Sequence, residues 1–225
     1  MALPADKIRL IVFDLDGTLI DSRKDLANSI NAMLTEFNRQ PLPEEIIAEY
    51  IGDGAGMLVR RALGDPDDEK FVESALTSFL NHYREHKLDH TYVYDGVFTA
   101  LDALKAGRQM AVLTNKPVKP AEAICNALGL TPYFFRIYGG NSFSTKKPDP
   151  EGLTTLIHEA GVLPEETVMV GDSDVDILTA RRAKTWAIGC RYGLSSHTVE
   201  SIPSDYLVDF PKDWISALDA AKINR

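Results

Sequence analysis

The feature that most constrains the fold is a short apolar run that recurs along the chain and stops each time at polar residues. The first run covers residues 8–13 and is followed by Asp-Leu-Asp-Gly-Thr. Similar runs occupy 110–113 and 167–170, with weaker ones at 135–138 and 185–188. Short runs that are apolar throughout are typical of strands buried on both faces of a parallel sheet.

Helical patterns separate these runs. Apolar residues recur at helical spacing, and two of the patterns begin close to a proline, Pro120 and Pro150. The expected helices are 97–106, 120–128, 150–160 and 175–183. A tail at about 206–220 predicts a last strand and a last helix. Because strands and helices alternate, the sequence predicts an α/β fold with a Rossmann-like parallel-sheet core.

The segment 22–92 interrupts this alternation. It contains no convincing strand, and prolines and glycines divide it into helical patterns. These patterns lie at 26–37, 44–51, 55–63 and 67–85. We therefore expect residues 22–92 to form an inserted α-helical cap domain, and residues 1–21 with 93–225 to form the core.

Charge limits the classes of partner. The 225 residues include 24 basic and 33 acidic side chains, a formal net charge of −9. This balance argues against a general binder of nucleic acid or of anionic membranes. A small anionic substrate stays possible, because a metal and a few local cations override the negative net charge.

With no signal-peptide pattern and no long apolar run, we expect a cytoplasmic protein without a membrane partner. The pattern leaves the oligomeric state open, monomer or homodimer.

Polar side chains follow three of the apolar runs. Asp14 and Asp16 follow the first, Thr114 and Asn115 the second, and Asp172 another. Ligands of open parallel sheets bind outside the carboxyl ends of the strands, so these groups are expected to meet. Like charges placed so close repel one another. A divalent cation resolves the repulsion, and an all-oxygen set suits Mg²⁺.

Four motifs in order resemble those of the haloacid dehalogenase superfamily of phosphohydrolases. The run Asp14-Leu15-Asp16-Gly17-Thr18 resembles its first motif, Thr114 the second and Lys147 the third. Gly171-Asp172-Ser173-Asp174-Val175-Asp176 resembles the fourth. A helical cap inserted after the first motif also fits this superfamily, so the resemblance covers nearly the whole chain.

The resemblance implies a role for each carboxylate. Asp14 would attack phosphorus and form an aspartyl-phosphate, while Asp16 would protonate the leaving oxygen and then activate water. Mg²⁺ would be held by Asp14, the backbone carbonyl of Asp16 and Asp172. Asp176 joins this metal set either as a ligand or as the residue that orients it.

The same resemblance implies a cradle for the phosphoryl oxygens. Thr114, the backbone of Asn115 and Lys147 would hold them as charge shifts in the transition state. Asp16 also separates two branches of the superfamily, because dehalogenases lack this second carboxylate and need no Mg²⁺. Its presence favours a phosphatase acting on a small phosphorylated metabolite.

The cap carries the substrate prediction. The runs 50–54 and 58–63 resemble the cap of phosphoglycolate phosphatases, which implies 2-phosphoglycolate as the substrate. Arg61 is the candidate partner for its carboxylate, with a plain surface helix residue as the other interpretation. Gly52 and Gly54 would let the backbone approach the ligand. Lys184 departs from the subgroup, in which a glycine usually follows the helix after the fourth motif.

Other activities stay open. Within the superfamily they are pyrophosphatase, broad sugar-phosphate or nucleotide phosphatase, and β-phosphoglucomutase. A phosphoryl-accepting receiver module also combines an acidic Mg²⁺ site with Thr and Lys, but its acceptor Asp follows a middle strand and it has no room for a cap. A cap also implies opening and closing, with hinges expected near residues 19–22 and 92–96.

Overall fold

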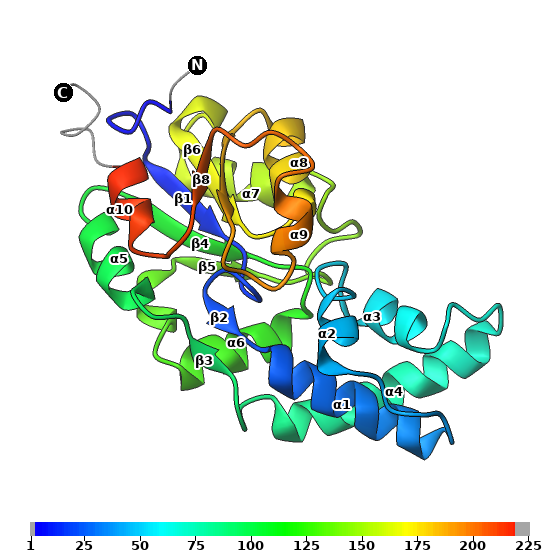
Figure 1. Cartoon of the computed structure of the whole chain (residues 1–225). Coiled ribbons are helices and arrows are strands. Elements are labelled where there is room, and N and C mark those ends of the chain that lie inside the picture. Colours follow the sequence, from blue (N-terminus) through cyan, green and yellow to red (C-terminus); the bar gives the residue numbers. More distant parts are fainter. Residues whose placement is uncertain (1–2, 219–225) are drawn as a thin grey trace.

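A six-stranded parallel sheet forms the centre of the computed structural model, which describes residues 3–218 (Figure 1). The strand order is β5-β4-β1-β6-β7-β8, and each neighbouring pair is parallel. The strands are β1 (Leu10–Phe13), β4 (Gln109–Leu113), β5 (Arg136–Tyr138), β6 (Thr167–Gly171), β7 (Trp186–Cys190) and β8 (Tyr206–Val208). All five apolar runs are therefore confirmed as strands, with ends shifted by a few residues.

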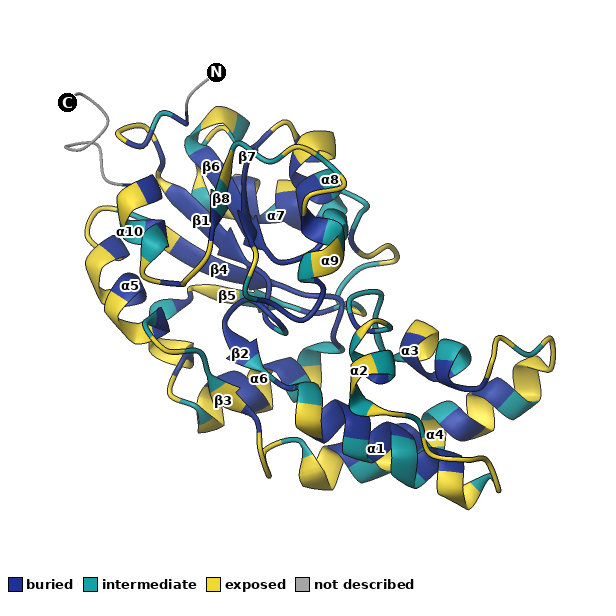
Figure 2. Ribbon diagram, viewed as in Figure 1, coloured by how far each residue is buried: buried dark blue, intermediate teal, exposed yellow. Residues whose placement is uncertain are grey.

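Helices cover both faces of this sheet. They are α5 (Val97–Leu104), α6 (Val118–Ala127), α7 (Glu151–Ala160), α8 (Asp174–Ala183), α9 (Ser196–Val199) and α10 (Asp213–Ala217). Successive residues of β1 point to opposite faces, so Val12 packs in the cluster with α7 and α8, while Phe13 packs in the cluster with α5 and α10. The rings of Phe13 and Trp214 lie 5.0 Å apart. This two-sided burial, dark blue in Figure 2, explains why β1 is apolar throughout.

Four helices follow β1 before the sheet resumes. They are α1 (Arg23–Glu36), α2 (Glu44–Ala48), α3 (Ala55–Ala62) and α4 (Glu69–His86). The long helices α1 and α4 lie side by side, away from the sheet in Figure 1, and bury Met33 and Phe79 between them. All four expected helices are confirmed. The division of the chain into core and cap domains at residues 22 and 92 stays a prediction.

Two short strands join these helices to the rest of the chain. β2 (Ile20–Asp21) and β3 (Tyr92–Val93) pair antiparallel, with Ile20 opposite Val93. The sequence analysis expects no strand in 22–92, yet Tyr92 lies in β3. Strands of two residues are too short to show an alternating pattern, so only their pairing defines them.

The remaining segments agree with the sequence pattern. β8 and α10 account for the predicted tail, although its positions 219–220 lie outside the described residues. Short 3₁₀ turns occur at Thr131–Tyr133 and Pro164–Glu166. α8 ends at Lys184 in a left-handed conformation, with φ 60°. Within residues 3–218, no helix combines the length and apolar character needed to cross a bilayer.

Candidate active site

The carboxyl ends of three adjacent strands bring the predicted site residues together. β1 lies between β4 and β6, so Asp14, Thr114 and Asp172 follow neighbouring strands. The turn after Asp14 needs Gly17, whose φ is 86°. A Cβ at this position would lie 2.1 Å from Asp172 Oδ2, so a side chain there would displace a carboxylate of the site.

Three buried carboxylates form the centre of the site. Ligand oxygens of Asp14, Asp172 and Asp176 all lie within 4.8 Å of one another. Burial, above all, raises the pKa of Asp14 to about 6, although the charge of Lys147 opposes the shift. Burial and then the charges of Asp14 and Asp176 raise the pKa of Asp172 well above its usual value. Such a crowded all-oxygen set fits a hard divalent cation such as Mg²⁺.

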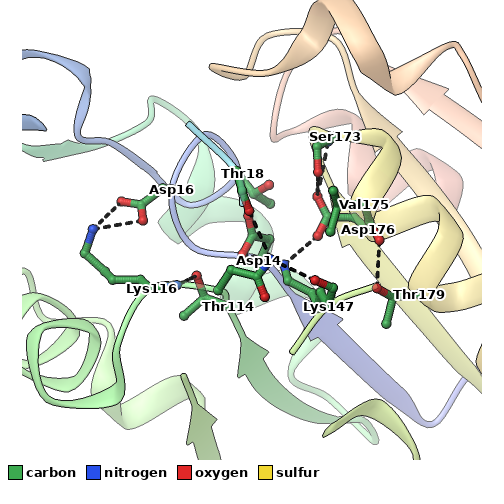
Figure 3. A network of polar contacts seen from close by, with 12 residues as sticks. Asp14, Asp16, Thr18, Thr114, Lys116, Lys147, Ser173, Val175, Asp176 and Thr179 are labelled. Atoms are coloured by element: carbon green, nitrogen blue, oxygen red, sulfur yellow. Dashed lines mark hydrogen bonds and ion pairs between the residues drawn. The ribbon is translucent and has the colours of Figure 1, made fainter. Parts of the chain in front are cut away.

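Lys147 is the cation of this cluster. Its Nζ donates to Asp14 Oδ1 at 2.8 Å and to Asp176 Oδ1 at 2.6 Å (Figure 3). Burial by itself would lower the pKa of Lys147, but the two carboxylates outweigh it and raise the pKa, so the ammonium stays charged. The other oxygen of Asp176 accepts from the backbone N–H and the hydroxyl of Ser173, at 3.1 and 2.7 Å. Asp176 is therefore held in place by the protein itself.

Asp16 has a different partner, Lys116. The Lys116 Nζ donates to both carboxylate oxygens, at 3.0 and 2.9 Å (Figure 3). Ser22 Oγ donates to one of these oxygens at 2.6 Å. Burial alone would lower the pKa of Lys116, but the Asp16 charge raises it overall. The sequence analysis missed Lys116. Its position two residues after Thr114 was one available signal.

The segment after β4 is fixed by hydrogen bonds. Thr114 Oγ1 accepts from the Lys116 N–H at 3.2 Å. Asn115 Nδ2 donates to the carbonyls of Gly52 and Lys147, both at 3.0 Å. Asn115 therefore links the expected third motif to the helical segment.

One cavity combines the catalytic candidates with residues of the helical segment. Asp14, Asp16, Thr114, Asn115 and Lys116 line it from the sheet side. From the helical segment it is lined by Leu26, Ile51, Gly52, Gly54, Ala55, Leu58, Phe79, Leu80 and Tyr83.

The loop between α2 and α3 lies against the site. Ser195 Oγ donates to the carbonyl of Ile51 at 2.9 Å, and Lys146 Nζ donates to that of Asp53 at 2.6 Å. Gly54 has φ 86°, and a Cβ there would lie 3.0 Å from the carbonyl oxygen of Asn115. This glycine allows a close backbone approach to the loop after β4. The expected approach of Gly52 and Gly54 to a ligand stays a prediction.

The structure does not bring Arg61 into this group. Its Nη2 donates to Asp53 Oδ2 at 2.5 Å and its Nη1 to the carbonyl of Tyr50 at 3.3 Å. Arg61 lines a separate cavity, together with Asp174 and His197, rather than the one that contains Asp14. Its assignment to the substrate carboxylate stays a prediction without support from this placement.

Comparison with known proteins shows similarity to phosphoglycolate phosphatases. The chain is 41% identical over 197 residues to a phosphoglycolate phosphatase of Pseudomonas putida, covering 84% of this chain and 72% of that protein. It is 37% identical over 202 residues to a phosphoglycolate phosphatase of Rhodospirillum rubrum, covering 86% and 84%.

Solved structures share the fold. The crystal structure of a predicted phosphoglycolate phosphatase from Haemophilus somnus 129PT superposes with a TM-score of 0.88 at 33% identity, over 93% of this chain and 97% of that one. CbbY from Rhodobacter sphaeroides, solved in complex with phosphate, gives 0.75 at 25% identity, over 94% and 99%. The family described as haloacid dehalogenase-like hydrolase matches residues 11–190. The predicted fold class and resemblance are confirmed, and the chain belongs to the haloacid dehalogenase-like hydrolase family.

Proposed function

We propose that the protein is a phosphoglycolate phosphatase, which hydrolyses 2-phosphoglycolate to glycolate and phosphate with Mg²⁺. The observation that carries the proposal is the position of Asp14, a buried carboxylate at the end of β1 that shares its cavity with Asp16 and is paired with Lys147. The relatives named phosphoglycolate phosphatase support the choice of substrate.

The reaction requires a nucleophile and a separate group that donates and accepts a proton. An oxygen of ionised Asp14 attacks phosphorus, the bond from phosphorus to the ester oxygen breaks, and Asp16 gives a proton to the departing glycolate. Asp16 then takes a proton from water, which attacks the aspartyl-phosphate and releases phosphate and Asp14. Lys147 favours the ionised form of Asp14 and so counteracts the effect of burial on its pKa.

Asp14, Asp172 and the backbone carbonyl of Asp16 would hold Mg²⁺, with Asp176 as a further ligand or as the group that orients the set. When bound, the cation neutralises charge on the phosphoryl oxygens. Thr114, the backbone of Asn115 and Lys147 would hold these oxygens during transfer.

Phosphate release tests the proposal. Purified protein with Mg²⁺ is assayed against 2-phosphoglycolate, pyrophosphate, sugar phosphates and nucleotides, with Asp14→Asn as the blank. We expect kcat/KM for 2-phosphoglycolate to exceed that for the other compounds about a hundredfold, a difference of about 2.7 kcal/mol. Chelation with EDTA should abolish release, and added Mg²⁺ should restore it.

Three outcomes would count against this. A flat profile would reduce the function to a broad phosphatase. Equal behaviour of the parent protein and Asp14→Asn, or a single turnover that leaves a stable phosphoprotein, would contradict hydrolysis at Asp14 and favour a phosphate-holding module.

A further inference from the structure

Tyr83 places an unused hydrogen-bond donor in the cavity over Asp14. The residue belongs to α4, is 3% exposed and lines this cavity. Its hydroxyl has no acceptor for its proton among residues 3–218. Burial raises its pKa to about 12, so the group keeps its proton at neutral pH. A buried hydroxyl whose proton has no acceptor costs free energy, and such a group in a cavity points to a ligand that accepts the proton.

Lys116 stands beside Tyr83. Its Nζ lies 4.7 Å from the centroid of the Tyr83 ring, and the residue is 6% exposed. The carboxylate that this ammonium binds is Asp16, through both oxygens. The cavity that contains Asp14 is therefore lined by two further groups. One is the Lys116 ammonium, which binds a carboxylate, and the other is the Tyr83 hydroxyl, whose proton has no acceptor among the described residues.

We propose that Lys116 and Tyr83 form the subsite for the carboxylate of 2-phosphoglycolate, and that this carboxylate takes the place of Asp16 on Lys116. The inference rests on the proposed function and deepens it. It assigns the carboxylate to the segment after β4 and to α4, rather than to Arg61.

The covalent structure of the substrate supports this position. In 2-phosphoglycolate a single methylene separates the ester oxygen from the carboxylate. Asp16 must reach the ester oxygen to protonate it, so the residue that binds the carboxylate has to adjoin Asp16. Lys116 does so, whereas Arg61 is paired with Asp53 and lines another cavity.

The exchange of partners also links recognition to chemistry. Asp16 cannot turn to the leaving oxygen while both its oxygens accept from Lys116. A substrate that carries its own carboxylate replaces Asp16 on the ammonium and frees it for proton transfer. An ester without a carboxylate leaves Asp16 held, so the discrimination should appear in kcat as well as in KM.

Tyr83→Phe is the decisive variant. The readout is the ratio of kcat/KM for 2-phosphoglycolate to kcat/KM for ethyl phosphate. Ethyl phosphate has the same two-carbon skeleton, with a methyl group in place of the carboxylate. Loss of a hydrogen bond to a charged group should lower this ratio about tenfold, with ethyl phosphate little changed. The fold should persist, because the hydroxyl proton has no acceptor among residues 3–218, and a thermal melt checks this.

Tyr94→Phe is the matched control. It also removes a buried hydroxyl without a partner among the described residues, but Tyr94 is not one of the residues that line this cavity. The ratio should equal that of the parent protein. Lys116→Met should lower the ratio further than Tyr83→Phe, and should lower kcat for 2-phosphoglycolate.

The possible failures are distinct. A parent protein without preference for 2-phosphoglycolate over ethyl phosphate would overturn both the function and the subsite. A preference that survives in Tyr83→Phe would overturn the subsite alone, and a preference lost in Arg61→Gln but not in Tyr83→Phe would return the carboxylate to Arg61. If Lys116→Met does not fold, Tyr83→Phe still decides.

Discussion

At the residue scale, the charge balance of the carboxylate cluster depends on Lys147. This ammonium pairs with Asp14 and Asp176, whereas Asp172 is held by neutral donors, the Ser195 N–H at 2.9 Å and Thr18 Oγ1 at 3.2 Å. The cluster therefore keeps an excess of negative charge in a buried place. A bound divalent cation would compensate it, so we expect added Mg²⁺ to raise the free energy of unfolding.

Lys147→Met should destabilise the metal-free protein strongly. The variant leaves two buried carboxylates without their cation, and breaking a buried ion pair in this way costs about 3–5 kcal/mol. The free energy of unfolding in urea, measured in EDTA, checks this. Lys146→Met is the control, because that exposed lysine donates to the Asp53 carbonyl rather than to a buried carboxylate, and its loss should cost well under 1 kcal/mol. Equal losses in both variants would contradict the account.

At the element scale, Asp25 ties the start of α1 to the segment that leads into β3. The carboxylate is 1% exposed and accepts from the backbone N–H groups of His90 and Thr91, at 3.0 and 2.8 Å. Thr91 Oγ1 adds a third donor at 2.7 Å. Burial by itself would raise the pKa of Asp25, but the hydrogen bonds from His90 and Thr91 outweigh it and lower the pKa below its ordinary value of 3.8.

Asp25→Asn should reveal this in the pH dependence of stability. A carboxyl whose pKa is lower in the folded state stabilises the fold above the unfolded-state pKa, and the contribution is lost as the pH falls through the folded-state pKa. We expect the variant to lose about 2 kcal/mol at pH 7, and the difference from the parent to shrink below about pH 4. Urea unfolding at roughly pH 3 to 7, the range in which carboxyl groups titrate, measures this difference in the free energy of unfolding. Asp89→Asn, an exposed carboxylate beside His86, should show a much smaller loss.

At the scale of the whole molecule, two connections between the helical segment and the rest of the chain bear on its movement, in addition to the contact of Tyr83 with Lys116. One is the β2–β3 ribbon, in which the two strands that connect the helical segment to the rest of the chain pair with each other. The other is the loop between α2 and α3, held by Ser195, Asn115 and Lys146. The hinges expected near 19–22 and 92–96 coincide with the ribbon, and their movement stays a prediction. Opening would break the polar contacts of the loop.

Ser195→Ala should loosen the loop without unfolding the protein. It removes the donor to the Ile51 carbonyl, so amide hydrogen exchange of residues 51–54 should quicken severalfold while the melting temperature changes little. Exchange measured by mass spectrometry tests this. Ser196→Ala, next in sequence, should leave the exchange of these residues unchanged. Loop exchange that is insensitive to Ser195 would show that other contacts hold the loop.

Local patterns determined much of this protein. Runs such as 110–113 and the helical spacing of 97–106 predict elements, because burial on one face or both imposes its period on neighbouring residues. The strand ends then place Asp14, Thr114 and Asp172 together, because the carboxyl ends of parallel strands share one edge. Motif order supplied Lys147, whose Nζ the structure brings to Asp14.

Only the tertiary structure decided the partners of the remaining groups. Lys116 and Tyr83 are 33 positions apart and belong to different elements, so no spacing indicates that they share a cavity. Arg61 looked equally suited to an anion, yet its helix directs it to Asp53. A residue's type and period are local properties, whereas the atom that its charge meets depends on how separate helices and loops pack.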